Sequence, residues 1–242
     1  SVDGTWDDHD YGVNDGGVNF PKKDEAKAEL VRFFGFDKNH TINKHNGVYH
    51  SNTYTSNGVK TKALFLDTRY FRSDLKRDPN KRRRYTTSDT GTMLGPEQWS
   101  WLEQEMADTT VDLFLIASSI QVIANDHWFE KWGNLPHERQ RFIDMCKDKA
   151  VIVLSGDRHI AEISSIKNGS YNLIDATSSG LTHTWRSYRY EANELRIGKQ
   201  FAVTNFGLLK VIKQSYGFDV HIEFRESYSN QLLQLLVFQF AD

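Results

Sequence analysis

The sequence predicts an α/β fold, and three observations lead to this prediction. The chain has 242 residues, 38% of them hydrophobic and 13% aromatic, which is enough to bury the core of one substantial domain. An apolar run at 111–118, a helix-like segment at 136–147 and an apolar run at 150–154 match a strand–helix–strand unit with parallel strands. No repeat, low-complexity tract or linker divides residues 1–242, so we expect a single domain.

The N-terminal part predicts one helix and then one hairpin. Residues 21–34 carry apolar side chains at helical spacing, begin with proline and stop at Gly35. Strand-like runs at 47–55 and 60–70 flank Asn57-Gly58, the dipeptide most typical of a two-residue hairpin turn. We therefore expect two antiparallel strands directly after the first helix.

The rest of the chain continues this alternation. The polar stretch 73–92 is expected to be a loop, and it carries the basic run 81–84. A second helix is expected from Gly95, because apolar residues recur three and four positions apart after it. Later strand-like segments lie at 171–176, 206–213 and 218–224, and the last two should pair antiparallel across a polar turn.

The composition excludes several classes of protein. The chain has 30 Lys and Arg against 32 Asp and Glu, so no overall field attracts nucleic acid, and we expect no such partner. No apolar stretch approaches the roughly 20 residues of a membrane span, so we expect a soluble protein. The single Cys146 can form no internal disulfide. Sequons at Asn39 and Asn168 favour a secreted protein or one of the endomembrane lumen.

Two segments concentrate metal-ligating side chains. The first is the acidic stretch 7–15, and the second is Asp157-Arg158-His159, directly after an apolar strand. Ligands bind at the carboxyl ends of strands in α/β sheets, so the second segment can aim two side chains at one ion. Carboxylates with imidazole suit Zn, Mn or Fe, and further oxygens would admit Ca. Asx turns in the first segment and an ion pair in the second are the structural alternatives.

Five blocks follow one another in a recognisable order. They are Trp6-Asp7-Asp8-His9-Asp10-Tyr11-Gly12 with Asn14-Asp15, Leu94-Gly95-Pro96-Glu97-Gln98-Trp99-Ser100-Trp101-Leu102-Glu103, Ser118-Ser119-Ile120-Gln121, Ser155-Gly156-Asp157-Arg158-His159-Ile160-Ala161-Glu162 and Thr177-Ser178-Ser179-Gly180-Leu181-Thr182. This pattern resembles the alkaline phosphatase D (PhoD-like) family of calcineurin-like metallophosphoesterases, over residues 5–207. The resemblance implies a β-sandwich of mixed sheets flanked by helices, with two or more metal ions, and hydrolysis of phosphomonoesters or phosphodiesters.

The resemblance also implies roles for single residues. Asp8 stands where the superfamily has a metal ligand, and His9 where it has the histidine that contacts the scissile phosphate and protonates the leaving group. Asp157 and His159 match the last ligand block of the PhoD-like proteins. Asp8 and His9 are therefore the expected catalytic residues, and Asp8, Asp157 and His159 the expected metal ligands.

Two more residues are candidates for the substrate side of the site. Arg158 could clamp a phosphate oxygen, although an exposed arginine is the ordinary alternative. Gln121 is the polar residue nearest to the position of the superfamily's intermediate ligand. The substrate class implied is a phosphoester of a small molecule, a nucleotide or a lipid, attacked by a metal-activated water.

The resemblance leaves one part of the family pattern unmatched. Two further ligand blocks precede the Asp-Asp-His-Asp block in the superfamily, and here only five residues precede Trp6. We therefore expect a PhoD-like domain without its leading N-terminal strands, which is either a fragment or is completed by a second chain. The alternative function is a catalytically silent scaffold that serves as a binding module.

Overall fold

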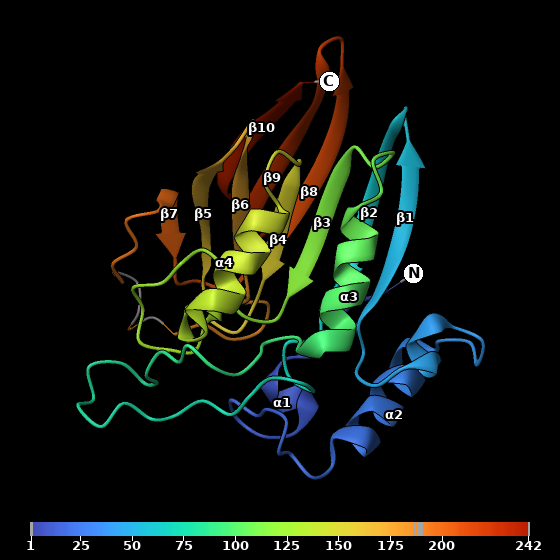
Figure 1. Cartoon of the computed structure of the whole chain (residues 1–242). Coiled ribbons are helices and arrows are strands. Elements are labelled where there is room, and N and C mark those ends of the chain that lie inside the picture. Colours follow the sequence, from blue (N-terminus) through green and yellow to red (C-terminus); the bar gives the residue numbers. More distant parts are fainter. Residues whose placement is uncertain (1, 186, 188–190, 242) are drawn as a thin grey trace.

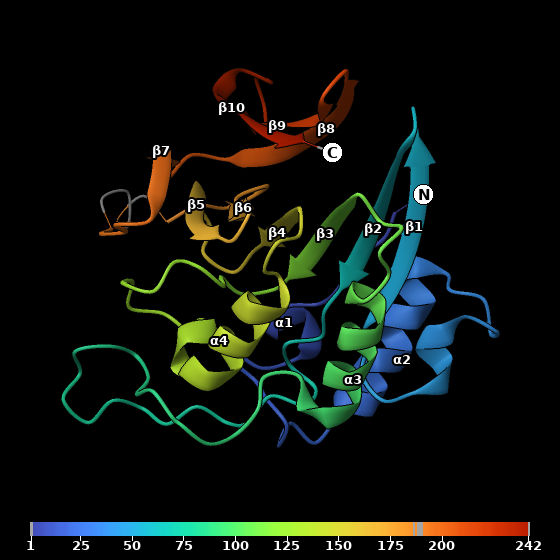
Figure 2. The same ribbon diagram turned by 45° about the horizontal axis from the view of Figure 1, so that its top comes forward.

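Two β-sheets face each other and helices cover the outer face of the larger sheet. The computed structural model describes residues 2–185, 187 and 191–241 (Figures 1 and 2). The large sheet has the strand order β1-β2-β3-β4-β6-β5-β7, and the small antiparallel sheet has the order β10-β9-β8. The expected sandwich of two sheets flanked by helices is thus confirmed, with the difference that only the large sheet is mixed.

The elements have the following bounds. The helices are α1 (Asp8–Tyr11), α2 (Lys23–Phe34), η1 (Thr41–Lys44), α3 (Gly95–Met106), η2 (Trp132–Asn134) and α4 (Pro136–Met145). The strands are β1 (His50–Ser56), β2 (Val59–Phe65), β3 (Leu113–Ser118), β4 (Val151–Ser155), β5 (Ala161–Asn168), β6 (Tyr171–Ser178), β7 (Arg196–Phe201), β8 (Asn205–Gln214), β9 (Gly217–Glu226) and β10 (Leu232–Ala241).

The N-terminal helix and hairpin lie where the sequence predicts them. Helix α2 ends at Gly35, whose φ of 67° is the left-handed conformation that glycine adopts without strain. Strands β1 and β2 pair antiparallel around Asn57 and Gly58, which both have positive φ, as a type I′ turn requires. The right-handed twist of the two strands matches this turn, so the short loop and the pairing support each other.

Four strands of the large sheet run parallel and determine where a site can form. Strands β2, β3, β4 and β6 pair parallel in that order, and α3 and α4 make the first two crossovers. Both faces of these strands are covered, one by α3 and α4 and the other by the small sheet, which explains their nearly continuous apolar runs. The carboxyl ends of the four strands therefore lie along one edge of the sheet.

Three strands have no counterpart in the sequence prediction. Strand β5 pairs antiparallel with β6 across Gly169, whose φ is 82°, and its sequence AEISSIKN mixes apolar and polar residues. Strand β7 is a polar edge strand, and β10 completes the small sheet. The polar sequence of β7 explains why periodicity passes over it, whereas β10, with the sequence LLQLLVFQFA, carries a strong apolar signal that the prediction overlooked.

A third cluster of apolar side chains fixes the N-terminal segment against the strand ends. Trp6 and Tyr11 pack edge to face, with ring centroids 5.0 Å apart, in a cluster with Ile42, Val48 and Tyr70. The indole nitrogen of Trp6 donates to Asp67 Oδ1 at 2.9 Å. The acidic stretch that follows Trp6 is thereby held at the carboxyl edge of the sheet.

Two surface features bear on the expected cellular location. Among the described residues, no helix combines the length and the apolar character needed to cross a membrane. The two sequons differ, because Asn39 is exposed whereas Asn168 is buried and its amide donates to the carbonyl of Ile143 at 2.8 Å. A glycan could therefore be accommodated by the folded chain at Asn39 and not at Asn168.

Candidate functional site

A polar cleft of about 320 Å³ opens at the carboxyl edge of the parallel strands. It is lined by Asp7, Asp8, His9, Asn14, Asp15, Arg84, Phe129, Asp157, Arg158, His159 and Trp185. The lining comes from the N-terminal segment, from the long loop before α3, from the loop after β3, from the turn after β4 and from the segment after β6. The cleft thus brings together the two segments that the sequence singles out as rich in metal ligands.

Helix α1 places the N-terminal carboxylates. The Asp8 carboxylate accepts hydrogen bonds from the N–H of His9 at 2.6 Å and from the N–H of Asp15 at 2.9 Å. Asp8 therefore joins the start of the acidic stretch 7–15 to its end. The carboxylates of Asp8 and Asp15 both line the cleft. The backbone N–H of Asp7 donates to Asp10 Oδ2 at 3.3 Å, so Asp10 caps the helix on the outside.

The turn after β4 orients the second pair of candidates. Asp157 and His159 have φ values of 64° and 53°, a left-handed conformation that costs a residue other than glycine of order 1 kcal/mol or more. The N–H of Arg158 donates to the carbonyl of Gly156 at 2.7 Å, and the N–H of Gly156 to the carbonyl of Ser119 at 3.1 Å. Backbone of this kind is concentrated at functional sites.

Five carboxylates form two overlapping groups in and beneath the cleft. Possible ligand atoms of Asp7, Glu130 and Asp157 all lie within 4.8 Å of one another, as do those of Asp8, Asp15 and Glu130. Glu130 belongs to both groups and its side chain is fully buried. This density of like charge requires compensation by cations.

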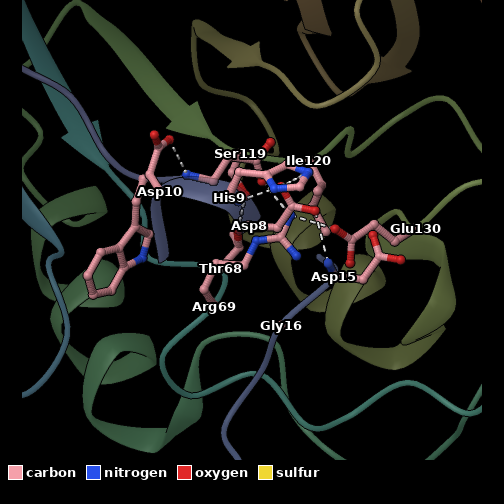
Figure 3. Close-up of polar contacts among 12 residues, drawn as sticks. Asp8, His9, Asp10, Asp15, Gly16, Thr68, Arg69, Ser119, Ile120 and Glu130 are labelled. Carbon is pink, nitrogen blue, oxygen red and sulfur yellow. Dashed lines mark hydrogen bonds and ion pairs between the residues drawn. The ribbon is translucent and has the colours of Figure 1, made fainter. Parts of the chain in front are cut away.

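Three arginines supply part of that compensation. Nη2 of Arg69 pairs with Asp7 and lies 2.5 Å from Glu130 Oε1 (Figure 3). Nη2 of Arg72 lies 3.5 Å from Glu130 Oε2, and Nη2 of Arg84 lies 2.7 Å from Asp15 Oδ2.

Burial raises the pKa of three carboxyls in this cluster. Burial, with the charges of Asp7 and Glu130, raises the pKa of Asp157 well above its ordinary value. Burial also raises the pKa of Asp7 and of Glu130, although Arg69 opposes both shifts. Burial lowers the pKa of His159, which favours the neutral imidazole that binds metals.

The residues present fit a hard divalent cation. Most donors are carboxylate oxygens, and His159 adds a ring nitrogen. The Nδ1 atom of His159 is buried without a hydrogen-bond partner in the described part of the chain, and the Glu130 carboxylate is met only by the guanidinium groups of Arg69 and Arg72. A bound cation would supply a partner for atoms of this kind, which are otherwise costly to bury.

His9 differs from the other candidates by its exposure. Its side chain is 79% exposed, and Nε2 lies 3.9 Å from Asp8 Oδ1. The ring is therefore free to meet a bound substrate at the mouth of the cleft. His159 lies deeper and stacks with Trp185, with ring centroids 6.0 Å apart.

Of the two residues expected on the substrate side, Arg158 lines the cleft and Gln121 does not. Arg158 lines the cleft but is only 3% exposed, and its Nη2 atom donates to Glu191 Oε2 at 2.5 Å. Gln121 is absent from the lining of the cleft, because its amide donates to Glu162 Oε1 and Thr177 Oγ1 at 2.8 Å each. Gln121 is thus placed to support the strand ends beneath the site.

Sequence reasoning did not single out the residues that complete the charge cluster. Arg69 and Arg72 lie in the segment after β2, and Glu130 lies in the loop after β3. The signal that could have found them is their place after strands parallel to β4, because those strands end at the same edge as Ser155.

Comparisons with known proteins bear on the family and the fold of the chain. The sequence model of the PhoD-like phosphatase family matches residues 37–187. A solved structure named "Structure of PhoD" is similar in fold, with a TM-score of 0.63 and 19% sequence identity. The match covers 96% of this chain and 50% of the solved one, so the chain spans about half the length of that protein. No curated protein matches. The chain belongs to the PhoD-like phosphatase family.

Proposed function

We propose that the chain hydrolyses phosphoester bonds in a metal-dependent reaction, with His9 as the acid that protonates the leaving group. The observation that carries this proposal is the convergence of carboxylates, one exposed histidine and one half-buried histidine in a single cleft at the strand ends. Family membership supports phosphoesterase chemistry of this general kind.

Each residue has a separate task in the proposed reaction. Metal ions would be held by the carboxylates of Asp8, Asp15, Glu130 and Asp157, with His159 as a further candidate ligand in the same cleft. A bound divalent cation stabilises the charge on a phosphoryl group and makes water more acidic. The buried carboxylates keep their orientation through backbone hydrogen bonds and ion pairs, so little reorganisation is needed when substrate binds.

His9 is suited to proton transfer by position. It is attached to the first turn of α1, next to Asp8, and its ring projects to the open side of the cleft. A protonated Nε2 can donate to the oxygen of the departing group, and a positioned acid contributes roughly 100-fold or more to the rate. The substrate class we propose is a monoester or diester of a small molecule, a nucleotide or a lipid.

The test compares leaving groups in wild type and in His9→Gln. With Mn²⁺ present, the substitution should lower kcat for an alkyl phosphoester about 100-fold, and far less for a nitrophenyl ester, whose leaving group needs no proton. His137→Gln is the matched control, because His137 contacts the carbonyl of Gly91 outside the cleft. Equal losses for both esters would contradict the role of His9. Absence of metal-dependent hydrolysis with every phosphoester would contradict the function itself and favour a binding module.

A further inference from the structure

Basic side chains gather along one wall of the cleft. Arg84 and Arg158 both line the cleft, and their Cζ atoms lie 6.0 and 4.6 Å from the centre of the Phe129 ring. Arg84 comes from the long loop before α3, Arg158 from the turn after β4 and Phe129 from the loop after β3. Three separate segments therefore build one surface, and we call Arg84, Phe129 and Arg158 the basic wall.

The basic wall lies directly beside the carboxylates of the cleft. Nη2 of Arg84 lies 2.7 Å from Asp15 Oδ2, and Asp15 belongs to the second carboxylate group. Arg158 follows Asp157 in the chain, and Asp157 belongs to the first group. A substrate whose reacting phosphate is bound over the candidate metal ligands therefore meets the basic wall with its neighbouring atoms.

The loop that carries Arg84 is held against the cleft by its own contacts. Asp78 Oδ2 accepts hydrogen bonds from the N–H groups of Arg82 and Arg83, at 3.0 and 3.1 Å. The N–H of Arg84 donates to the carbonyl of Trp128 at 3.0 Å, which joins this loop to the loop after β3. The basic run of the sequence is thus part of the cleft wall and its rim, and it is not displayed on a separate loop.

The donors of the basic wall outnumber the acceptors that the chain supplies. In the described part of the chain, Nη1 of Arg158, Nε of Arg84 and both ring nitrogens of His127 are buried without a hydrogen-bond partner. Burial, together with positive charges that include Arg158 and Arg83, lowers the pKa of His127 well below its ordinary value. Buried donors without acceptors are costly, so their concentration here indicates a place for an anionic ligand.

We infer that the basic wall binds a second anionic group of the substrate, so that the chain prefers phosphoesters with a second phosphate near the reacting one. The inference rests on the proposed function and specifies its substrate class. Guanidinium groups bind phosphate oxygens through charge-assisted hydrogen bonds, and a phosphate supplies the acceptors that the wall lacks. The net charge of -2 does not oppose this binding, because salt screens exposed charges beyond about 10 Å at 0.1 M.

The experiment compares two esters that differ only in the second phosphate. They are the p-nitrophenyl ester of thymidine 5′-phosphate and the same ester with a further phosphate at the 3′ position. With Mn²⁺ present, kcat/KM of wild type should be about 10-fold higher for the ester with the 3′-phosphate, through a lower KM, which is the effect of one charge-assisted hydrogen bond. Nitrophenolate leaves without a proton, so the comparison does not depend on His9.

Three variants locate the preference. Arg83→Gln and Arg158→Lys should each bring the ratio of the two kcat/KM values close to one, because each removes guanidinium donors at the wall or its rim. Arg141→Gln is the control for loss of an arginine, because Arg141 pairs with Glu103 on the surface, and it should keep the wild-type ratio. Equal kcat/KM values for the two esters in wild type would overturn the inference, as would an unchanged ratio in Arg83→Gln. The Arg83→Gln result decides if Arg158→Lys does not fold.

A binding measurement separates the inference from the proposed function. Isothermal titration calorimetry with thymidine 3′,5′-bisphosphate and thymidine 5′-phosphate needs no hydrolysis, and wild type should bind the bisphosphate about 10-fold more tightly. Arg83→Gln should bind the two nucleotides about equally. If neither ester is hydrolysed but wild type still prefers the bisphosphate, the proposed function is wrong and the inference stands. Equal affinity of wild type for the two nucleotides would contradict the inference.

Discussion

The interior beneath the cleft contains charged side chains that are rarely buried without partners. Arg69, Arg72, Glu130 and Lys131 are all fully buried. Removing charge from water costs several kcal/mol per ion, and ion pairing returns that cost only with good geometry. The side chains beneath the cleft therefore lower the stability of the fold, compared with an apolar core, while they place charge at the candidate site.

Lys131 makes the stability of the chain depend on pH. Its Nζ donates to the carbonyls of His127 and Phe129, and burial, assisted by Arg83 and Arg158, lowers its pKa to about 7. Between pH 7 and about 10 the unfolded chain binds a proton that the folded chain does not, so rising pH favours folding. The contribution is about 1.4 kcal/mol for each unit by which the pKa is lowered.

This prediction is checked by urea unfolding of wild type and Lys131→Met at several pH values. The free energy of unfolding of wild type, minus that of Lys131→Met, should rise from pH 7 to pH 10. The exposed Lys147→Met serves as the control and should leave the pH profile unchanged. A difference that stays constant with pH would show that Lys131 is protonated in the folded chain.

Cys146 should be chemically silent in the folded protein. Its side chain is 1% exposed, and burial raises the pKa of the thiol far above its ordinary value. A thiol-specific disulfide reagent should therefore label no thiol in the native chain at pH 8 and one thiol in urea. Rapid labelling of the native chain would show that the core between α4 and the large sheet opens.

At the scale of elements, the loop after β3 is tied to β6 by one buried carboxylate. Asp175 accepts hydrogen bonds from the N–H groups of Val122 and Ile123, at 2.8 and 2.9 Å, and from Ser155 Oγ at 2.6 Å. The same loop continues to Glu130, so these bonds help to position a candidate metal ligand. Strand pairing alone would not place this irregular segment.

Asp175→Ala tests the contribution of this tether. The substitution leaves two buried N–H groups without acceptors, at about 1–3 kcal/mol for each, so the free energy of unfolding should fall by at least about 2 kcal/mol. Urea denaturation measures the change. Asp144→Ala, which removes an exposed carboxylate that accepts from Gln140, should change stability by less than about 0.5 kcal/mol. Similar effects of the two substitutions would contradict the tether.

At the scale of the whole molecule, a cation that binds only the folded chain should stabilise all of it. Such binding adds about 2.7 kcal/mol when free Mn²⁺ is 100 times its Kd, so Tm should rise with Mn²⁺ concentration. Asp8→Asn should remove most of this shift, because Asp8 belongs to the second carboxylate group.

Calorimetric scans with and without Mn²⁺ provide the measurement, and a chelator should reverse the shift. Asp144→Asn, far from the cleft lining, is the control that should retain it. A Tm that rises equally in Asp8→Asn and in wild type would place the cation elsewhere.

The sequence by itself determined the elements whose signals are local. The Asn57-Gly58 turn, the stop at Gly35, and the apolar runs of β3 and β4 each depend on neighbouring residues, so they could be predicted without the fold. The position of Asp157 and His159 could be predicted as well, because both come just after β4 and the end of that strand determines which edge of the sheet they occupy.

Only the tertiary structure decided which charges meet. Arg69 and Glu130 are 61 positions apart in the chain, and nothing local in either segment indicates that one guanidinium nitrogen is shared between Asp7 and Glu130. The same holds for Gln121, which sequence order placed near the substrate and packing turned toward Glu162. Side-chain pairing depends on how parallel strands from distant segments align at one edge, and that alignment exists only once the sheet has formed.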